Sequence, residues 1–189
     1  EAGADMVRLT TPSLKDLESL EEIRKNLNNQ GYHAPLIADV HFSPEVALEA
    51  AKIVEKVRIN PGNYLDKKYA GPDHYNEKTA SEHSGKLHER LLPLIRVCRE
   101  NGTAVRIGVN HGSLSERIKA WYGNTPGGMV ESALEFIRVF RSENFEKLVI
   151  SLKASSTGVM IRSNRLLVKR MMELGYRYPI HLGVTEAGN

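Results

Sequence analysis

The sequence predicts an α/β protein built around parallel β-strands. Short β-rich runs alternate with longer segments of helical periodicity, and such alternation is typical of parallel sheets. Most of the runs are continuously apolar, as strands buried on both faces are. Two architectures compete: a TIM (β/α)8 barrel, incomplete here, and an open doubly wound sheet. No G-x-G-x-x-G follows the first run, which argues against the dinucleotide-binding form of the open sheet.

Six runs are expected to be strands, so about two βα units of a barrel would be missing. In chain order they are Met6–Thr10, Leu36–Val40, Val57–Asn60, Val105–Val109, Leu148–Leu152 and Ile180–Thr185.

Cap residues and apolar stripes predict the helices between these runs. Ser13–Asp16 resembles a capping box, and Ser43 stands before a proline at a first helical position. An apolar stripe at helical spacing runs from Met129 to Phe140. Three glycines follow helical stretches, where a left-handed closing residue is favoured: Gly31, Gly102 and Gly175.

The connection from Asn63 to Asn101 is unusually long. Residues 64–90 are expected to form an exposed polar insertion, with the apolar stripe of a helix returning at Leu87. Pro93 is expected in the first turn of that helix.

Composition excludes several classes of protein. No apolar run approaches the roughly 20 residues that span a bilayer, and the single cysteine, Cys98, excludes an internal disulfide. The net charge is 26 − 23 = +3, which suits anionic small molecules as well as nucleic acid. The chain starts at Glu1 instead of methionine and ends directly after an apolar run, so we expect an interior piece of a longer protein, 1–189 being part of one barrel.

Four cations lie inside the apolar runs or at their ends, and these are the most informative residues: Arg8, Arg58, Arg106 and Lys153. A buried strand tolerates a charge only when something pairs with it. Two acids, Asp39 and Glu186, also stand at strand ends, which leaves an excess of about two positive charges before His41 is considered. Since strand ends build the active site of a barrel, a polyanion is the expected ligand; internal ion pairs are the alternative.

Other features support weaker hypotheses. Asp39 and His41 resemble metal-binding pairs, but no further ligand is near in sequence, so no metal site is predicted. Lys153 could form a Schiff base with a carbonyl substrate, as in an aldolase or lyase. His181 begins a run and is expected at the far end of the barrel, in a structural role. Because the cations lie in strands instead of on an exposed helix, nucleic acid is not an expected partner.

Motifs along the whole chain resemble those of the 4-hydroxy-3-methylbut-2-en-1-yl diphosphate synthase family, iron–sulfur enzymes of the methylerythritol phosphate route to isoprenoids. The matching stretches are 3–8 (GADMVR), 36–42 (LIADVHF), 57–63 (VRINPGN), 106–114 (RIGVNHGSL), 151–155 (SLKAS) and 181–188 (HLGVTEAG). The long connection and the stretch 111–117 resemble the long form of the family, found in chlamydiae, Bacteroidetes and plastids.

The resemblance implies a TIM barrel of which this chain supplies strands two to seven, with a C-terminal [4Fe-4S] domain absent from the chain. It implies reductive ring opening of 2-C-methyl-D-erythritol 2,4-cyclodiphosphate, with flavodoxin or ferredoxin as electron donor, a homodimer, a bacterial cytoplasmic location and no membrane partner. Cys98 matches none of the cluster ligands, so this piece alone is expected to be inactive.

The resemblance also implies roles for the site residues. Glu186 would serve proton transfer, and Asp39 would support the site by orienting His41 or Arg58. Residues expected to bind or lie near the diphosphate are Arg8, His41, Arg58, Asn60, Arg106, Asn110, Ser113, Lys153 and Ser155. The competing hypotheses are the Schiff-base enzyme that uses Lys153 and a non-enzymatic anion-binding or assembly module.

Overall fold

The computed structural model describes residues 3–65 and 77–185, and its centre is a sheet of five parallel strands in the order β1-β2-β3-β4-β5. This sequential order belongs to a barrel, because doubly wound sheets reverse their strand order at a switch point. The strands are β1 (Val7–Thr10), β2 (Leu36–Asp39), β3 (Lys56–Ile59), β4 (Ala104–Asn110) and β5 (Leu148–Lys153). The fold is therefore the predicted α/β barrel, incomplete in the described residues.

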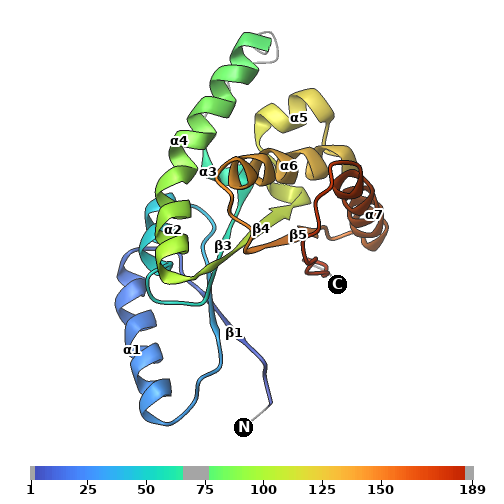
Figure 1. Ribbon diagram of the computed structural model, residues 1–189. Helices are drawn as coiled ribbons and strands as arrows, with labels where there is room; N and C mark the ends of the chain where they lie inside the picture. The colour runs from blue at the N-terminus through green and yellow to red at the C-terminus, as the bar shows by residue number, and fades with distance from the viewer. Residues whose placement is uncertain (1–2, 66–76, 186–189) are drawn as a thin grey trace.

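Helices connect successive strands, and α1, α2 and α4 lie along one side of the sheet (Figure 1). The helices are α1 (Lys15–Asn29), α2 (Pro44–Ala50), α3 (Pro61–Tyr64), α4 (Glu77–Asn101), α5 (Glu116–Tyr122), α6 (Pro126–Ser142) and α7 (Thr157–Glu173). The N-terminal part of α4 projects beyond the strands (Figure 1).

The apolar core lies between the sheet and these helices. Val57 and Ile59 of β3 are almost completely buried, and so is Phe140 of α6. Successive strand residues point to opposite faces, so Lys56 and Arg58 of β3 lie on the inner face. The strands are thus apolar toward the helices and charged toward the barrel interior.

The predicted helix start at Ser43 and the three closing glycines are confirmed, whereas the capping box at Ser13–Asp16 is only half formed. Asp16 Oδ2 accepts from the Ser13 N–H at 2.9 Å, but the N-cap of α1 is Leu14 and no side chain caps the helix. The Ser43 Oγ accepts a hydrogen bond from the Val46 N–H at 3.3 Å. Gly31, Gly102 and Gly175 have φ values of 77°, 70° and 71°, a left-handed conformation that glycine adopts without steric penalty.

Two sequence predictions need correction. The predicted strand at Ile180–Thr185 is represented, among the described residues, by a single parallel bridge between Ile150 and Ile180. The segment pairs on one side only, through contacts such as Thr185 N–H to Ala154 O at 3.2 Å. Pro93 lies inside α4 instead of in its first turn, because the helix begins at Glu77. The helix therefore occupies the last part of the expected 64–90 insertion, and residues 66–76 lie outside the described residues.

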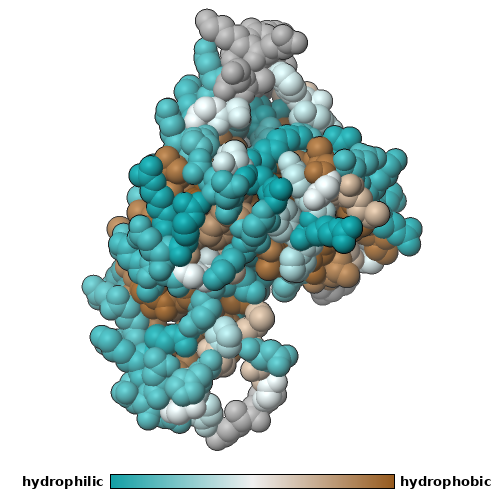
Figure 2. Space-filling model, in the orientation of Figure 1, coloured by the Kyte–Doolittle hydropathy of each residue, from teal (hydrophilic) through white to brown (hydrophobic). Residues whose placement is uncertain are grey.

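Exposed apolar side chains gather on α7 and the segment after it (Figure 2). Met172 is 73% exposed and Leu182 is 64% exposed.

Candidate functional site

A cavity of about 320 Å³ lies on the inner face of the sheet, and strand register explains its lining. Asp39 pairs in register with Arg58, and Arg58 pairs with Arg106. Two levels higher on the same face, Asn110 pairs with Lys153. Side chains of paired residues share a face of the sheet, so these groups converge. The lining residues are Arg8, Asp39, His41, Arg58, Arg106, Gly108, Asn110, Ser151, Lys153, Val184 and Thr185.

Three guanidinium groups in the cavity share the carboxylate of Asp39. Its oxygens lie 3.0 Å from Arg58 Nη1, 3.4 Å from Arg8 Nη1 and 3.8 Å from Arg106 Nη2. His41 Nε2 is 3.5 Å from the same carboxylate. Among the described residues Asp39 is the one acid that lines the cavity, so the arginines do not each have an acid of their own.

Arg58 is held on several sides and is only 4% exposed. Nη1 donates to Asp39 and lies against His41 Nε2, while Nη2 donates to the Gly108 carbonyl at 2.9 Å. A Cβ on residue 108 would lie 2.3 Å from Arg58 Nε, which is closer than real Cβ atoms come. The guanidinium of Arg58 can therefore lie at this position only because residue 108 has no side chain.

Arg106 has unused hydrogen-bonding capacity. Its side chain is 4% exposed, yet its Nε has no hydrogen-bond partner. A buried donor without a partner carries a desolvation penalty. A ligand with an acceptor atom within reach of this Nε would remove the penalty.

The positive charges in the cavity are close enough to lower one another's pKa values. Burial, followed by the charges of Arg58 and Arg8, lowers the pKa of Arg106 to about 10. Burial, followed by the charges of Arg106 and Arg8, lowers the pKa of Lys153. The pKa of His41 is lowered by burial and then by Arg58, so its ring is neutral near pH 7 and its Nε2 can accept from Arg58.

The described residues that line the cavity carry a clear excess of positive charge. Four cations and one carboxylate line the cavity, and 4 − 1 = +3. Glu186, the second predicted acid, lies outside the described residues. Such a cavity is suited to a polyanion, and planar guanidinium groups match phosphate oxygens. A lowered lysine pKa also suits a Schiff-base nucleophile, the alternative hypothesis for Lys153.

Seven of the predicted site residues meet at the cavity: Arg8, Asp39, His41, Arg58, Arg106, Asn110 and Lys153. Asn60 and Ser113 do not line it. Asn60 is 2% exposed, and its Nδ2 donates to Ser113 Oγ at 3.0 Å, so the pair joins the loops after β3 and β4. Ser155 follows β5 with an exposed side chain and is also outside the lining.

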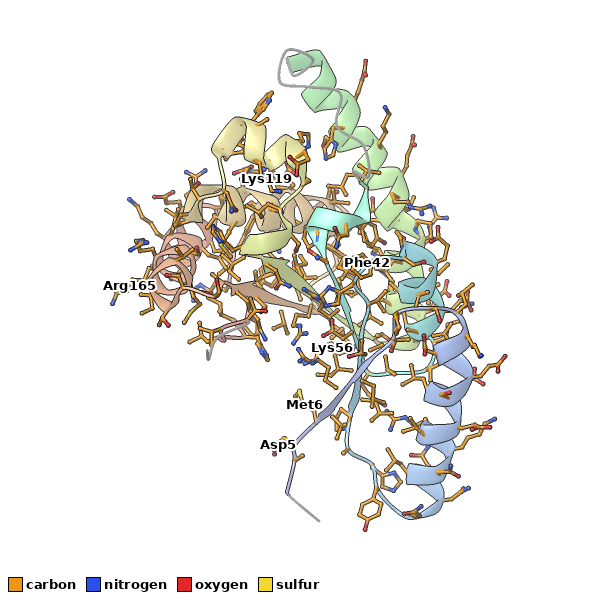
Figure 3. The ribbon with its side chains drawn as sticks, turned by 180° about the vertical axis from the view of Figure 1, so that it is seen from behind. Asp5, Met6, Phe42, Lys56, Lys119 and Arg165 are labelled. Atoms are coloured by element: carbon orange, nitrogen blue, oxygen red, sulfur yellow. The ribbon has the colours of Figure 1, made fainter. Side chains whose placement is uncertain are left out.

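Sequence reasoning missed several inner-face residues. Gly108, Ser151 and Thr185 line the cavity, and the first two lie two positions from Arg106 and Lys153 on the same strands. Lys56 is a further inward cation, beside Met6 on the inner side of the sheet (Figure 3), with its Nζ 3.5 Å from Met6 Sδ. Strand alternation from the recognised cations could have found all but Thr185.

The described residues do not fit an iron–sulfur cluster. Cys98 is fully buried in α4, and burial raises the pKa of its thiol to about 12, whereas cluster ligands are thiolates. No group of three or more His, Cys, Asp or Glu side chains in the described part of the chain could hold a metal ion. No helix in that part is long and apolar enough to cross a membrane.

Comparisons with known proteins all point to one protein family. A family model described as the GcpE TIM-barrel domain matches residues 1–189. The chain is 54% identical to the 4-hydroxy-3-methylbut-2-en-1-yl diphosphate synthase (flavodoxin) of Parabacteroides distasonis, over all of the chain and 31% of that protein. It is 51% identical to the flavodoxin-type synthase of Akkermansia muciniphila, over 32% of its length, and 53% identical to the ferredoxin-type synthase of Thermosynechococcus vestitus, over 48%. The chain thus spans about a third of the length of the first of these relatives.

Proposed function

The chain belongs to the GcpE TIM-barrel family, and from that premise we propose that it is the substrate-binding barrel of a 4-hydroxy-3-methylbut-2-en-1-yl diphosphate synthase. The substrate would be 2-C-methyl-D-erythritol 2,4-cyclodiphosphate. Its ring is opened and a hydroxyl group leaves as water, with two electrons supplied from outside this part of the chain. The single observation that carries the proposal is that, among the described residues, four strand cations and one carboxylate line a common cavity.

The cations would bind the diphosphate, and their burial and lowered pKa values support this role. Arg106 has a buried Nε without a partner, and the pKa values of Arg106 and Lys153 are lowered by burial and by the other cations. A bound polyanion would reverse both effects, since opposite charges nearby favour the charged forms. Arg8, with a side chain that is 47% exposed, is placed to contact ligand at the open side.

Asp39 and His41 would orient the guanidinium groups instead of reacting. Asp39 holds Arg58 at 3.0 Å, and the neutral His41 ring accepts from the same Nη1. Preorganised donors bind anions without reorganising at the moment of binding. Glu186 would serve proton transfer, and Asn60, Ser113 and Ser155 would support the loops around the ligand.

Electron supply would lie outside this part of the chain, because the described residues offer no cluster ligands. We propose that a [4Fe-4S] domain elsewhere in the full-length protein receives electrons from flavodoxin or ferredoxin, the donors named for the relatives. A homodimer in the bacterial cytoplasm is part of the same proposal. The isolated barrel piece would bind ligand but not turn it over.

Isothermal titration calorimetry on the full-length protein tests the proposal. Arg8→Ala and Arg106→Met should each weaken binding of the cyclic diphosphate. A hydrogen bond to a charged group contributes about 1.5–3 kcal/mol, which corresponds to about 10–150-fold in Kd.

Arg165→Ala is the matched control, because Arg165 lies on α7 with an exposed side chain on the outer side of the barrel (Figure 3). This variant should bind the cyclic diphosphate like the wild type. If all three variants bind equally well, the cavity is not the diphosphate site.

A further inference from the structure

Ser151 brings a hydroxyl group to the wall of the cavity. It lies on β5 two residues before Lys153, so the two side chains share the inner face of the sheet. Ser151 is 1% exposed and lines the cavity. A polar side chain therefore stands at an inner-face position, beside the space that a ligand would fill.

In the part of the chain that the structure describes, no group forms a hydrogen bond with this hydroxyl. Ser151 pairs in register with Gly108 of β4, which has no side chain to offer. Arg58 lies over Gly108, but its Nη1 and Nη2 donate to Asp39 and to the Gly108 carbonyl. The Ser151 hydroxyl is thus available to a ligand.

Strand register places Ser151 between the levels of two cations. Val149, two residues earlier on the inner face, pairs with Arg106, and Lys153 lies two residues later. At roughly 3.3 Å per residue, Ser151 is about 7 Å along the strand from either level. A ligand that contacts both Arg106 and Lys153 must therefore pass the serine hydroxyl.

We propose that Ser151 is a further ligand-binding residue, whose hydroxyl donates a hydrogen bond to a phosphate oxygen held between Arg106 and Lys153. The inference rests on the proposed function for the identity of the natural ligand. A serine adds a hydrogen-bond donor at this level without adding another positive charge, which the neighbouring cations would disfavour.

This role separates affinity from stability. Ser151→Ala keeps a small side chain and removes a hydroxyl that has no hydrogen bond among the described residues. The Tm of the unliganded full-length protein should therefore stay within about 2 °C of the wild type. The Kd for a phosphate ligand should rise by about tenfold or more, as expected when a hydrogen bond to a charged group is lost.

Thermal unfolding and isothermal titration calorimetry on the full-length protein test both expectations. Two ligands are titrated, the cyclic diphosphate and inorganic diphosphate. Inorganic diphosphate has no carbon atoms or alcohol groups, so a loss of affinity for it reports contacts with phosphate oxygens. Ser151→Ala should bind both ligands more weakly. If it weakens the cyclic diphosphate alone, the hydroxyl contacts the carbon skeleton of the ligand and the proposal is overturned.

Ser163→Ala is the matched control. Ser163 is a fully buried serine of α7 whose Oγ donates to the Val159 carbonyl at 2.8 Å, and it does not line the cavity. This variant should bind both ligands like the wild type. If it weakens binding as much as Ser151→Ala does, the effect at Ser151 is not a ligand contact.

Ser151→Cys decides the test if the alanine variant fails to fold. A thiol has nearly the shape of the hydroxyl but is a weak donor, so the Kd for both ligands should rise by about threefold or more. Wild-type affinity for inorganic diphosphate in either folded variant would refute the role of Ser151.

The wild type separates this inference from the proposed function. If it binds inorganic diphosphate but not the cyclic diphosphate, the proposed substrate is wrong, and the inorganic ligand still tests Ser151. If it binds neither ligand, both proposals are refuted.

Discussion

Replacing Asp39 with asparagine is the most informative single change to the cavity. Asp39 is 6% exposed, and Arg8, Arg58 and Arg106 share its carboxylate. Asparagine has almost the same shape and keeps one acceptor oxygen, so the change removes charge with little change in packing. It leaves four cavity cations without any acid among the described residues.

The expected loss of stability follows from burial. Arg58 is 4% exposed and Arg106 is 3% exposed, so their charges are poorly solvated once Asp39 is neutral. Removing one partner of a buried ion pair costs about 3–5 kcal/mol. For a domain of this size, 1 kcal/mol shifts Tm by about 2–4 °C, so the barrel transition should fall by about 6–20 °C.

The assay is thermal unfolding of the full-length protein at pH 7, with and without sulfate. Sulfate should raise the Tm of Asp39→Asn more than that of the wild type, because a bound anion replaces the lost charge and stabilises the native state by mass action. Glu146→Gln is the control, since the exposed Glu146–Arg141 pair should contribute less than about 1 kcal/mol. A Tm for Asp39→Asn within 2 °C of wild type, or equal stabilisation of both proteins by sulfate, would refute the reasoning.

Three further predictions concern anion binding by the cavity and the stability of the barrel. Gly108→Ala should weaken anion binding by about tenfold or more in calorimetry, because the new Cβ would lie 2.3 Å from Arg58 Nε. The circular dichroism spectrum should be unchanged, and wild-type affinity would contradict the prediction. Thr103→Val should lower the free energy of unfolding in urea by about 1–3 kcal/mol, since the buried Thr103 Oγ1 donates to Ala51 O at 2.7 Å; an unchanged midpoint would count against it. Stability should fall as the pH drops below 6.5, because the pKa values of His41 and His181 are lowered in the folded chain and the unfolded chain therefore binds protons first. His41→Asn should make this fall in Tm from pH 7 to 5 less steep, and an equally steep fall would exclude His41 as a cause.

Much of the site could be predicted because charge inside an apolar strand is an unusual signal. Arg8, Arg58 and Arg106 stand between aliphatic residues, and such positions require a partner or a ligand. Parallel register then carries them to one cavity, as expected. Lys56 precedes Val57 at the start of its strand, so the sequence pattern does not distinguish it from an ordinary lysine at a strand end.

The remaining differences come from information that local patterns do not contain. Asn60 follows a strand like a site residue, but it is buried against Ser113 of another loop, a pairing that only the tertiary fold defines. Helix α4 begins at Glu77 although its apolar stripe becomes regular only near Leu87, because the first turns project beyond the strands (Figure 1).

A crystal structure of the full-length protein with bound cyclic diphosphate tests the central claim most directly. We predict electron density for the diphosphate inside the 320 Å³ cavity, with its phosphate oxygens within hydrogen-bonding distance of Arg106 and Lys153. Diphosphate bound elsewhere, or an Arg106 side chain paired with an acid from another part of the chain and no ligand in the cavity, would contradict it.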